Sequence, residues 1–166
     1  MTILHSMGKK VAIILIMVIL ISVPFLGCLG GNDPGDVILG PNDIPGDWYD
    51  SSPLWSQEDY AQRNMRNTDN EASIWLVMIY YSSVEEAEQV FQDKEEALSS
   101  FIAYEPDLGD DCFLAKSDNV SAPFVKEVYC IVGTKYIDFT ILNSEMLELY
   151  SDDWVLDIVE MQISRL

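Results

Sequence analysis

Histidine is the residue that this sequence most nearly lacks, since its 166 residues include only His5. Ser-His-Asp and Cys-His mechanisms need an imidazole as general base, and many zinc sites use imidazole ligands. The sequence also has no glycine-rich phosphate loop followed by a lysine. We therefore expect that the protein is not an enzyme and binds no cofactor, with a hydrolase that uses carboxylates alone as the remote alternative.

Basic residues are scarce as well: 9 Lys and Arg stand against 28 Asp and Glu, which gives a formal charge of −19. So acidic a surface repels phosphate backbones, and we expect no nucleic-acid partner. No segment has the ligand spacing of a calcium loop, and we predict no metal site. The chain does contain 49% hydrophobic residues, with 4 Trp, 8 Tyr and 6 Phe, enough to form one packed domain.

The N-terminal segment has the layout of an export signal. Lys9 and Lys10 precede an apolar stretch from Val11 to Leu26. This stretch is shorter than the roughly 20 residues that cross a bilayer as a stable helix. Residues 1–27 are therefore predicted to be a signal peptide, with an uncleaved signal anchor as the alternative. Cleavage after residue 27 would remove two bases and no acid, leaving seven bases, 28 acids, a charge of −21 and no histidine.

The end of this segment carries a short motif, Phe25-Leu26-Gly27-Cys28. It resembles the lipobox of prokaryotic lipoproteins, in which an apolar and then a small residue precede a cysteine. The resemblance implies that the thiol of Cys28 is lipidated, that cleavage follows Gly27 and that Cys28 becomes the new N-terminus. Lipidation and the signal anchor both place the domain on the extracytoplasmic side of the cell membrane.

The segment after the motif is rich in Gly, Pro and Asp. Residues 28–46 show no hydrophobic periodicity and are predicted to be a flexible tether, although Val37, Ile38 and Leu39 are apolar enough to touch the domain. Residues 43–48, Asp-Ile-Pro-Gly-Asp-Trp, partly resemble the Asp-Leu-Pro-x-Gly-Trp opening of uncharacterised prokaryotic, in particular archaeal, surface lipoproteins. A Pro-Gly turn before a core tryptophan is the alternative interpretation.

Residues 47–166 are predicted to form a single α+β domain. Five or six strands are expected in an antiparallel sheet. In residues 73–81, SIWLVMIYY, both faces are apolar, which indicates a strand covered on both sides. This favours helices on opposite faces of the sheet. Such an α/β/α sandwich is similar to extrinsic photosystem accessory proteins and certain bacterial lipoproteins in element order alone.

Two main helices are expected to cover this sheet. The first begins after a capping box formed by Ser83 and Glu86, and its apolar stripe continues to Phe101 and Ile102. The second follows the N-cap Ser151.

Residues 124–132 and 135–142 form a predicted hairpin, with Gly133 as the first residue of a two-residue turn. Pairing Val132 with Lys135 places Cys130 opposite Ile137. The more polar face of this hairpin then carries Glu127, Tyr129, Tyr136, Asp138 and Thr140.

Two cysteines remain besides Cys28. If residues 112–115 form a strand that pairs with the hairpin about a loop centred near Ser121, Cys112 lies opposite Cys130. We predict a disulfide between them, as an oxidising compartment would favour, with two buried free thiols as the alternative. Asn119, in the predicted loop, begins a glycosylation sequon.

The leading functional hypothesis follows from an anchored domain without a catalytic set. It is a non-enzymatic, lipid-anchored surface protein that acts as an interaction module for a protein or an envelope component. The alternative is a lipoprotein that binds a small ligand or a cation. Its pocket would use aromatic residues whose other interpretation is core packing: Trp48, Trp55, Trp75, Tyr80 and Tyr81.

Overall fold

A computed structural model describes residues 33–117, 124–143 and 150–166, and Asp33–Leu166 forms one compact unit. In these residues eight strands form one antiparallel sheet in the order β1-β3-β4-β8-β7-β6-β5, with β2 paired to β3 beyond the end of β1. The strands are β1 (Trp48–Asp50), β2 (Trp55–Gln57), β3 (Tyr60–Asn67), β4 (Ser73–Tyr80), β5 (Ile102–Tyr104), β6 (Asp111–Ser117), β7 (Phe124–Val132) and β8 (Lys135–Asn143).

The predicted class, a single α+β domain with an antiparallel sheet, is confirmed. The predicted strand number was too low, because β2 and β5 have three residues each and so cannot display a clear alternation of polar and apolar positions. Among the described residues, no helix has both the length and the hydrophobicity needed to cross a membrane.

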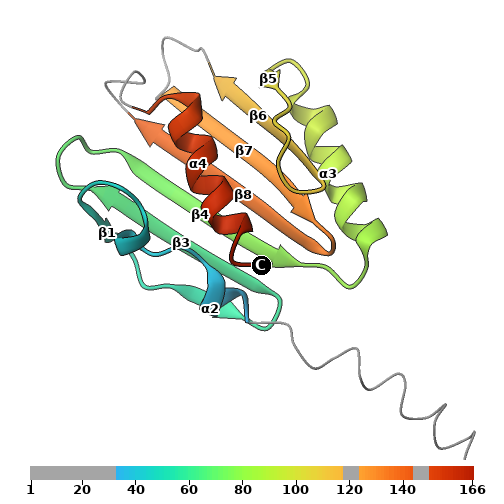
Figure 1. Cartoon of the computed structure of the whole chain (residues 1–166), viewed down its shortest axis with the longest axis horizontal. Coiled ribbons are helices and arrows are strands. Elements are labelled where there is room, and N and C mark those ends of the chain that lie inside the picture. Colours follow the sequence, from blue (N-terminus) through green and yellow to red (C-terminus); the bar gives the residue numbers. More distant parts are fainter. Residues whose placement is uncertain (1–32, 118–123, 144–149) are drawn as a thin grey trace, which may run out of the picture. The chain divides into compact units, whose positions relative to one another are not determined.

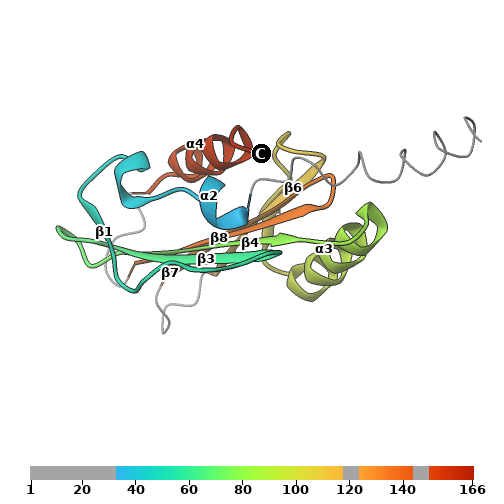
Figure 2. The same ribbon diagram turned by 90° about the horizontal axis from the view of Figure 1, so that it is seen from below.

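Helices lie on both faces of the sheet (Figures 1 and 2). One face is covered by α4 (Asp152–Ile163), the short helix α2 (Pro34–Val37) and the 3-10 turn η1 (Pro41–Asp43). The other face carries α3 (Val84–Leu98), which contacts β7 and β8. Figure 2 shows the sheet edge-on between these two layers, with α3 at one end.

Each face has its own hydrophobic core. The larger core lies beneath α4, where Leu76 and Phe139 of the sheet and Ile158 of the helix are almost completely buried. The smaller core lies beneath α3, where the ring of Phe91 is 5.3 Å from that of Phe113. Complete burial of such side chains contributes roughly 1.5–3 kcal/mol each, so both helices are held mainly by their apolar faces.

The hairpin face that was expected to be polar is partly a core. Tyr129 and Tyr136 are 1% and 5% exposed, because α3 packs over this end of the sheet. Glu127, Asp138 and Thr140 share that face and remain partly exposed. The alternation therefore predicted correctly which side chains share a face of the hairpin. It could not predict whether a helix covers that face, because tyrosine occurs on both buried and exposed faces.

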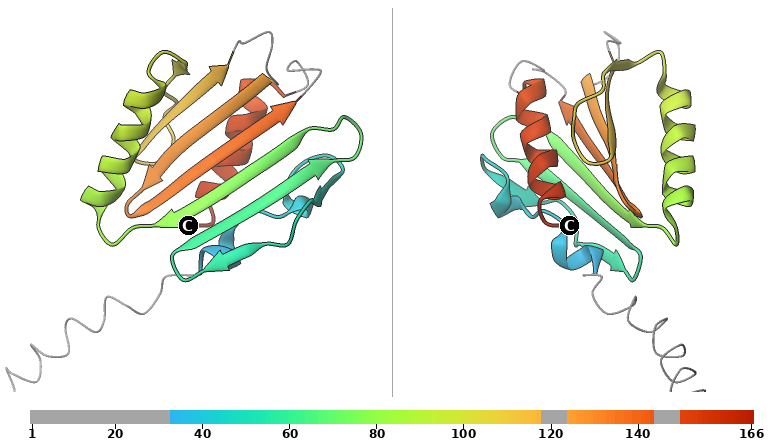
Figure 3. Two further views of the ribbon diagram at one scale, coloured as in Figure 1. Left: turned by 180° about the vertical axis from the view of Figure 1, so that it is seen from behind. Right: turned by 45° about the vertical axis from the view of Figure 1, so that its right-hand side comes forward.

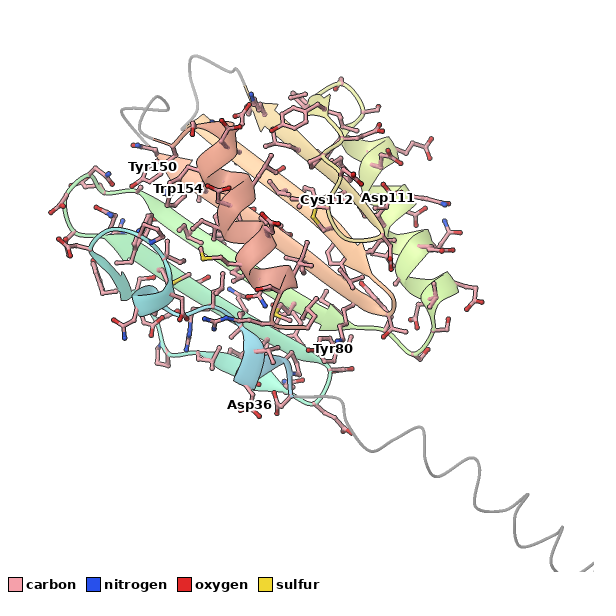
Figure 4. The ribbon with its side chains drawn as sticks, viewed as in Figure 1. Asp36, Tyr80, Asp111, Cys112, Tyr150 and Trp154 are labelled. Carbon is pink, nitrogen blue, oxygen red and sulfur yellow. A yellow bond between two sulfur atoms is a disulfide. The ribbon has the colours of Figure 1, made fainter. Side chains whose placement is uncertain are left out.

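The predicted register of the hairpin is confirmed: Val132 pairs with Lys135 and Cys130 with Ile137. Gly133 has a φ of +59°, a conformation that favours glycine at the start of such a turn. Cys112 lies opposite Cys130, as the spacing predicts, and the two Sγ atoms are 2.04 Å apart, at disulfide distance. Figure 4 shows this bond beneath the label of Cys112.

Both predicted helix N-caps are present. The Ser83 hydroxyl accepts a hydrogen bond from the Glu86 amide at 3.2 Å, and the Ser151 hydroxyl accepts one from the Trp154 amide at 3.1 Å. The Glu86 carboxylate, however, accepts from the backbone amide and hydroxyl of Ser82, one residue before the expected partner. The first helix also ends earlier than its apolar stripe predicts, because Ile102 begins β5.

The prediction of a flexible tether over residues 28–46 is wrong for its second part. Leu39 is completely buried in the larger core. The Gln162 side chain, also completely buried, accepts a hydrogen bond from the Leu39 amide at 2.8 Å and donates one to the Val37 carbonyl at 3.2 Å. The folded domain therefore includes residues 33–46, and residues 28–32 lie outside the described residues. Gly and Pro content misled the prediction, because burial of a few apolar residues outweighs it here.

Candidate functional site

The sheet face that carries α3 is only partly covered. α3 contacts β7 and β8, and among the described residues no helix lies over β2, β3 and β4 on this side. Figure 3, left, shows this face of the sheet with α3 along one side of it. We call its central uncovered part the open face, and its side chains come from alternating positions of four strands: Trp55, Tyr60, Gln62, Asn64, Trp75, Val77, Asp138 and Thr140. The same face continues beyond Asn64 with the exposed Arg66 and Tyr49, and beyond Thr140 with the partly exposed Glu127.

Two tryptophans dominate the open face. Trp55 is 57% exposed and Trp75 is 52% exposed, although tryptophan is usually well covered in a folded domain. The centre of the Trp55 ring lies 5.3 Å from that of the Tyr60 ring, and this contact holds Trp55 in place at the edge of the open face. The prediction that residues 73–81 are covered on both sides is therefore wrong at Trp75, because α3 does not extend over β4 at that position.

A chain of hydrogen bonds runs along β3 on the open face. The Tyr60 hydroxyl donates to Gln62 Oε1 at 2.7 Å, and Gln62 Nε2 donates to Asn64 Oδ1 at 3.1 Å. Asn64 Nδ2 then donates to the Ser52 hydroxyl at 3.2 Å. These side chains are held in place before any ligand arrives. Each amide has one N–H more than these bonds use.

Asp138 is the only charged side chain among the eight. Burial raises the pKa of its carboxyl to about 6, although the Thr140 hydroxyl donates to it at 3.1 Å and Lys94 lies near it, both of which lower the pKa. Nearby Glu127 raises the pKa further. Carboxyl groups whose pKa is raised by partial burial are frequent in functional sites.

The border between the open face and α3 is formed by buried phenols. Burial raises the pKa of both Tyr129 and Tyr136 well above the ordinary value, so both remain neutral. The Lys94 ammonium lies 4.6 Å from the centre of the Tyr129 ring. This cation–π contact attaches the middle of α3 to the sheet beside Asp138 and closes the surface on that side.

The five aromatic residues predicted as a pocket do not come together. Trp55 and Trp75 lie on the open face, whereas Trp48 is buried on the opposite face, 5.9 Å from Tyr150 and 6.3 Å from Trp154. The two remaining tyrosines are also separated: Tyr80 lies beneath the ammonium of Lys135, and Tyr81 packs on Tyr136. The core interpretation therefore holds for Trp48, and Tyr80 and Tyr81 are partly buried against the larger and the smaller core, respectively.

Six residues of the open face were not identified as site residues from the sequence: Tyr60, Gln62, Asn64, Val77, Asp138 and Thr140. In β3, Gln62 and Asn64 alternate with the buried Ala61 and Met65, and this alternation is visible in the sequence. Such a pattern predicts a half-exposed strand, but it does not distinguish a solvated face from a binding face.

Other acidic residues have local roles. Asp110 accepts a hydrogen bond from the Gly133 amide at 2.6 Å, next to the hairpin turn. Asp152 pairs with Lys116 and with the nearly buried Lys126 (2.7 Å) at the start of α4.

In the part of the chain that the structure describes, no three His, Cys, Asp or Glu side chains are placed to hold a metal ion. Cys28 and Asn119 lie outside the described residues.

Several hollows lie around these elements, two of them beside the helices. One, of about 510 Å³, runs along α4 beside Pro45, Trp154 and Met161. The other, of about 210 Å³, lies on the same face as the open face, at the C-terminal end of α3, and is lined by Phe101 and Glu127 among others. It extends the open face toward α3.

No protein-family model, curated protein or solved structure matches this chain.

Proposed function

We propose that this protein is a non-enzymatic binding module, anchored at the extracytoplasmic side of the cell membrane, and that the open face binds a component of the cell envelope. The observation that carries the proposal is the exposure of Trp55 and Trp75 on a rigid sheet. Tryptophan is enriched where proteins bind partners, because it buries a large area and loses little conformational entropy.

The surroundings of the tryptophans support this proposal. Their neighbours Gln62 and Asn64 are fixed in a hydrogen-bonded chain and do not need to be ordered on binding. A preorganised surface loses less entropy when it binds than a flexible one does. No second layer of the described residues covers these side chains, so a ligand can reach them from solvent.

The proposed anchor places the domain near the membrane. A lipid on Cys28 would leave four residues before Asp33, where the folded unit begins. Such a connection reaches at most about 18 Å when fully extended. The ligand is therefore expected in the envelope layer next to the membrane.

The test compares binding of the full chain, purified in detergent, to detergent-extracted envelope material from the cells that produce it. Trp75→Ser and Trp55→Ser are each expected to weaken binding about tenfold, as loss of a central aromatic contact does. Tyr104→Ser is the matched control, since Tyr104 is an exposed aromatic residue on β5, outside the open face.

Binding by the control should equal that of the wild type. All three variants should keep their unfolding midpoints, because the substituted side chains are exposed. The proposal is wrong if the wild type does not bind the envelope, or if both tryptophan variants bind as tightly as the wild type.

A further inference from the structure

The open face has little charge in a protein that is otherwise strongly acidic. Of its eight side chains only Asp138 is charged, and the flanking residues Arg66 and Glu127 on the same face add one charge of each sign, whereas the chain has a formal charge of −19. Exposed carboxylates are concentrated elsewhere, for example at Glu85, Glu88 and Glu96 on α3. A strongly cationic partner would find more complementary charge on α3 than on the open face. The open face is therefore suited to an uncharged polar ligand.

The register places hydrogen-bonding groups on both sides of the exposed ring. Trp75 on β4 has Asn64 beside it on β3 and Thr140 beside it on β8. The next position along β4, Val77, lies between Gln62 and Asp138 in the same way. Apolar side chains thus form a central row, bordered by amide, hydroxyl and carboxylate groups about 4.8 Å away on the neighbouring strands.

This pattern matches the surface of a sugar ring. A pyranose has an apolar face of C–H groups, and these are attracted to the negative face of an aromatic ring. Its hydroxyl groups lie around the rim, where each can both donate and accept a hydrogen bond. Amides and hydroxyls also do both, so Asn64, Gln62 and Thr140 can pair with hydroxyls in either direction.

The size of the open face also favours such a ligand. Its side chains span four strands and five residues of β3, which corresponds to about 14 by 14 Å, or about 200 Å². The open face can therefore hold a few linked sugar rings.

We propose that the ligand of the open face is a neutral glycan chain, with one sugar ring stacked on Trp75 and another on Trp55. This inference rests on the proposed function and specifies the envelope component by its chemistry. Gln62 and Asn64, on the strand between the two tryptophans, would bind the hydroxyls between the two stacked rings. Thr140 would bind a hydroxyl on the other side of Trp75, and Asp138 would accept hydrogen bonds from a pair of hydroxyls.

The experiment uses the same envelope binding assay with three preparations of the envelope. One is untreated, one is oxidised with periodate and washed, and one is digested with protease and washed. Periodate cleaves the bonds between neighbouring hydroxyl-bearing carbons, so it destroys most glycans and leaves the peptide backbone intact. Binding is expected to fall at least about tenfold after periodate and to be unchanged after protease.

Binding that survives periodate and is lost after protease would show a protein ligand. Binding that survives both treatments and is reproduced by vesicles of neutral phospholipid would show a lipid ligand. Either result would overturn the glycan assignment and leave the proposed function standing. Absence of binding to the untreated envelope would instead refute the proposed function itself.

A side-chain variant separates hydrogen bonding from stacking. Asn64→Leu removes the amide beside Trp75 and keeps the side-chain volume similar. It is expected to weaken binding about tenfold, while Tyr104→Ser again binds like the wild type. Unchanged binding by Asn64→Leu, with an unfolding midpoint that shows an intact fold, would contradict the glycan assignment, because an apolar contact alone would then account for the affinity.

Discussion

Asp138 allows the most direct test of the electrostatics of the open face. Burial raises the pKa of its carboxyl in the folded protein from an ordinary 3.8 to about 6. The folded state therefore binds a proton more tightly than the unfolded state. The contribution of this group to stability is complete below pH 3.8 and is lost as the pH rises through 6.

The magnitude follows from the same two values. Each pKa unit corresponds to about 1.4 kcal/mol, so the ionised carboxyl destabilises the fold by about 3 kcal/mol above pH 6. Asp138→Asn removes the charge and keeps an oxygen that can accept the Thr140 hydrogen bond. The variant is therefore expected to be more stable than the wild type at neutral pH by up to about 3 kcal/mol.

The assay is urea denaturation of both proteins at pH values from 3.5 to about 7.5, a range chosen to bracket the two pKa values. The difference between their free energies of unfolding should be smallest at the acidic end and should increase through pH 6. Asp43 and Asp152 have pKa values lowered by their basic partners, so they destabilise the fold as the pH falls, but they do so equally in both proteins.

Asp157→Asn is the control, because Asp157 is exposed on α4. Its effect should remain within about 0.5 kcal/mol. A difference between Asp138→Asn and the wild type that does not change with pH, or a variant less stable than the wild type at neutral pH, would refute the reasoning about burial of Asp138.

Three further predictions concern the rest of the chain. Gln162→Leu should destabilise the domain by about 3 kcal/mol in denaturation experiments, because it leaves two buried backbone groups of residues 37–39 without partners; a change below about 0.5 kcal/mol would contradict this. Reduction of the Cys112–Cys130 pair should lower stability by about 3 kcal/mol, whereas alkylation of both thiols in unreduced, denatured protein would exclude the disulfide. Cys28→Ala should release the protein from membranes or retain the uncleaved signal; unchanged membrane attachment at unchanged mass would exclude lipidation.

Local features of the fold could be predicted well from the sequence. The hairpin register followed from the turn at Gly133 and from the alternation of side chains on its two strands. The spacing of the two cysteines about a loop centred near Ser121 placed Cys112 opposite Cys130. The helix N-caps at Ser83 and Ser151 were visible because a cap depends on neighbours only three residues away.

Features that depend on distant contacts could not be predicted. Residues 33–46 have the composition of a linker, yet Leu39 is buried because Gln162, more than 120 residues later, binds its amide. The strand of residues 73–81 is apolar on both sides, but Trp75 is exposed because α3 covers β7 and β8 and not β4. Neither outcome is encoded in the local pattern.

The sequence alone therefore determined the two main helices, the longer strands, the pairing of the hairpin and the scarcity of histidine and basic residues. It could not determine which of several apolar or aromatic residues remain exposed, since exposure depends on where the helices pack. The tertiary structure decided that Trp48 is buried on one face while Trp55 and Trp75 lie on the other. A candidate binding surface thus arose from incomplete coverage of a sheet, which is a property of the assembled layers and not of any single segment.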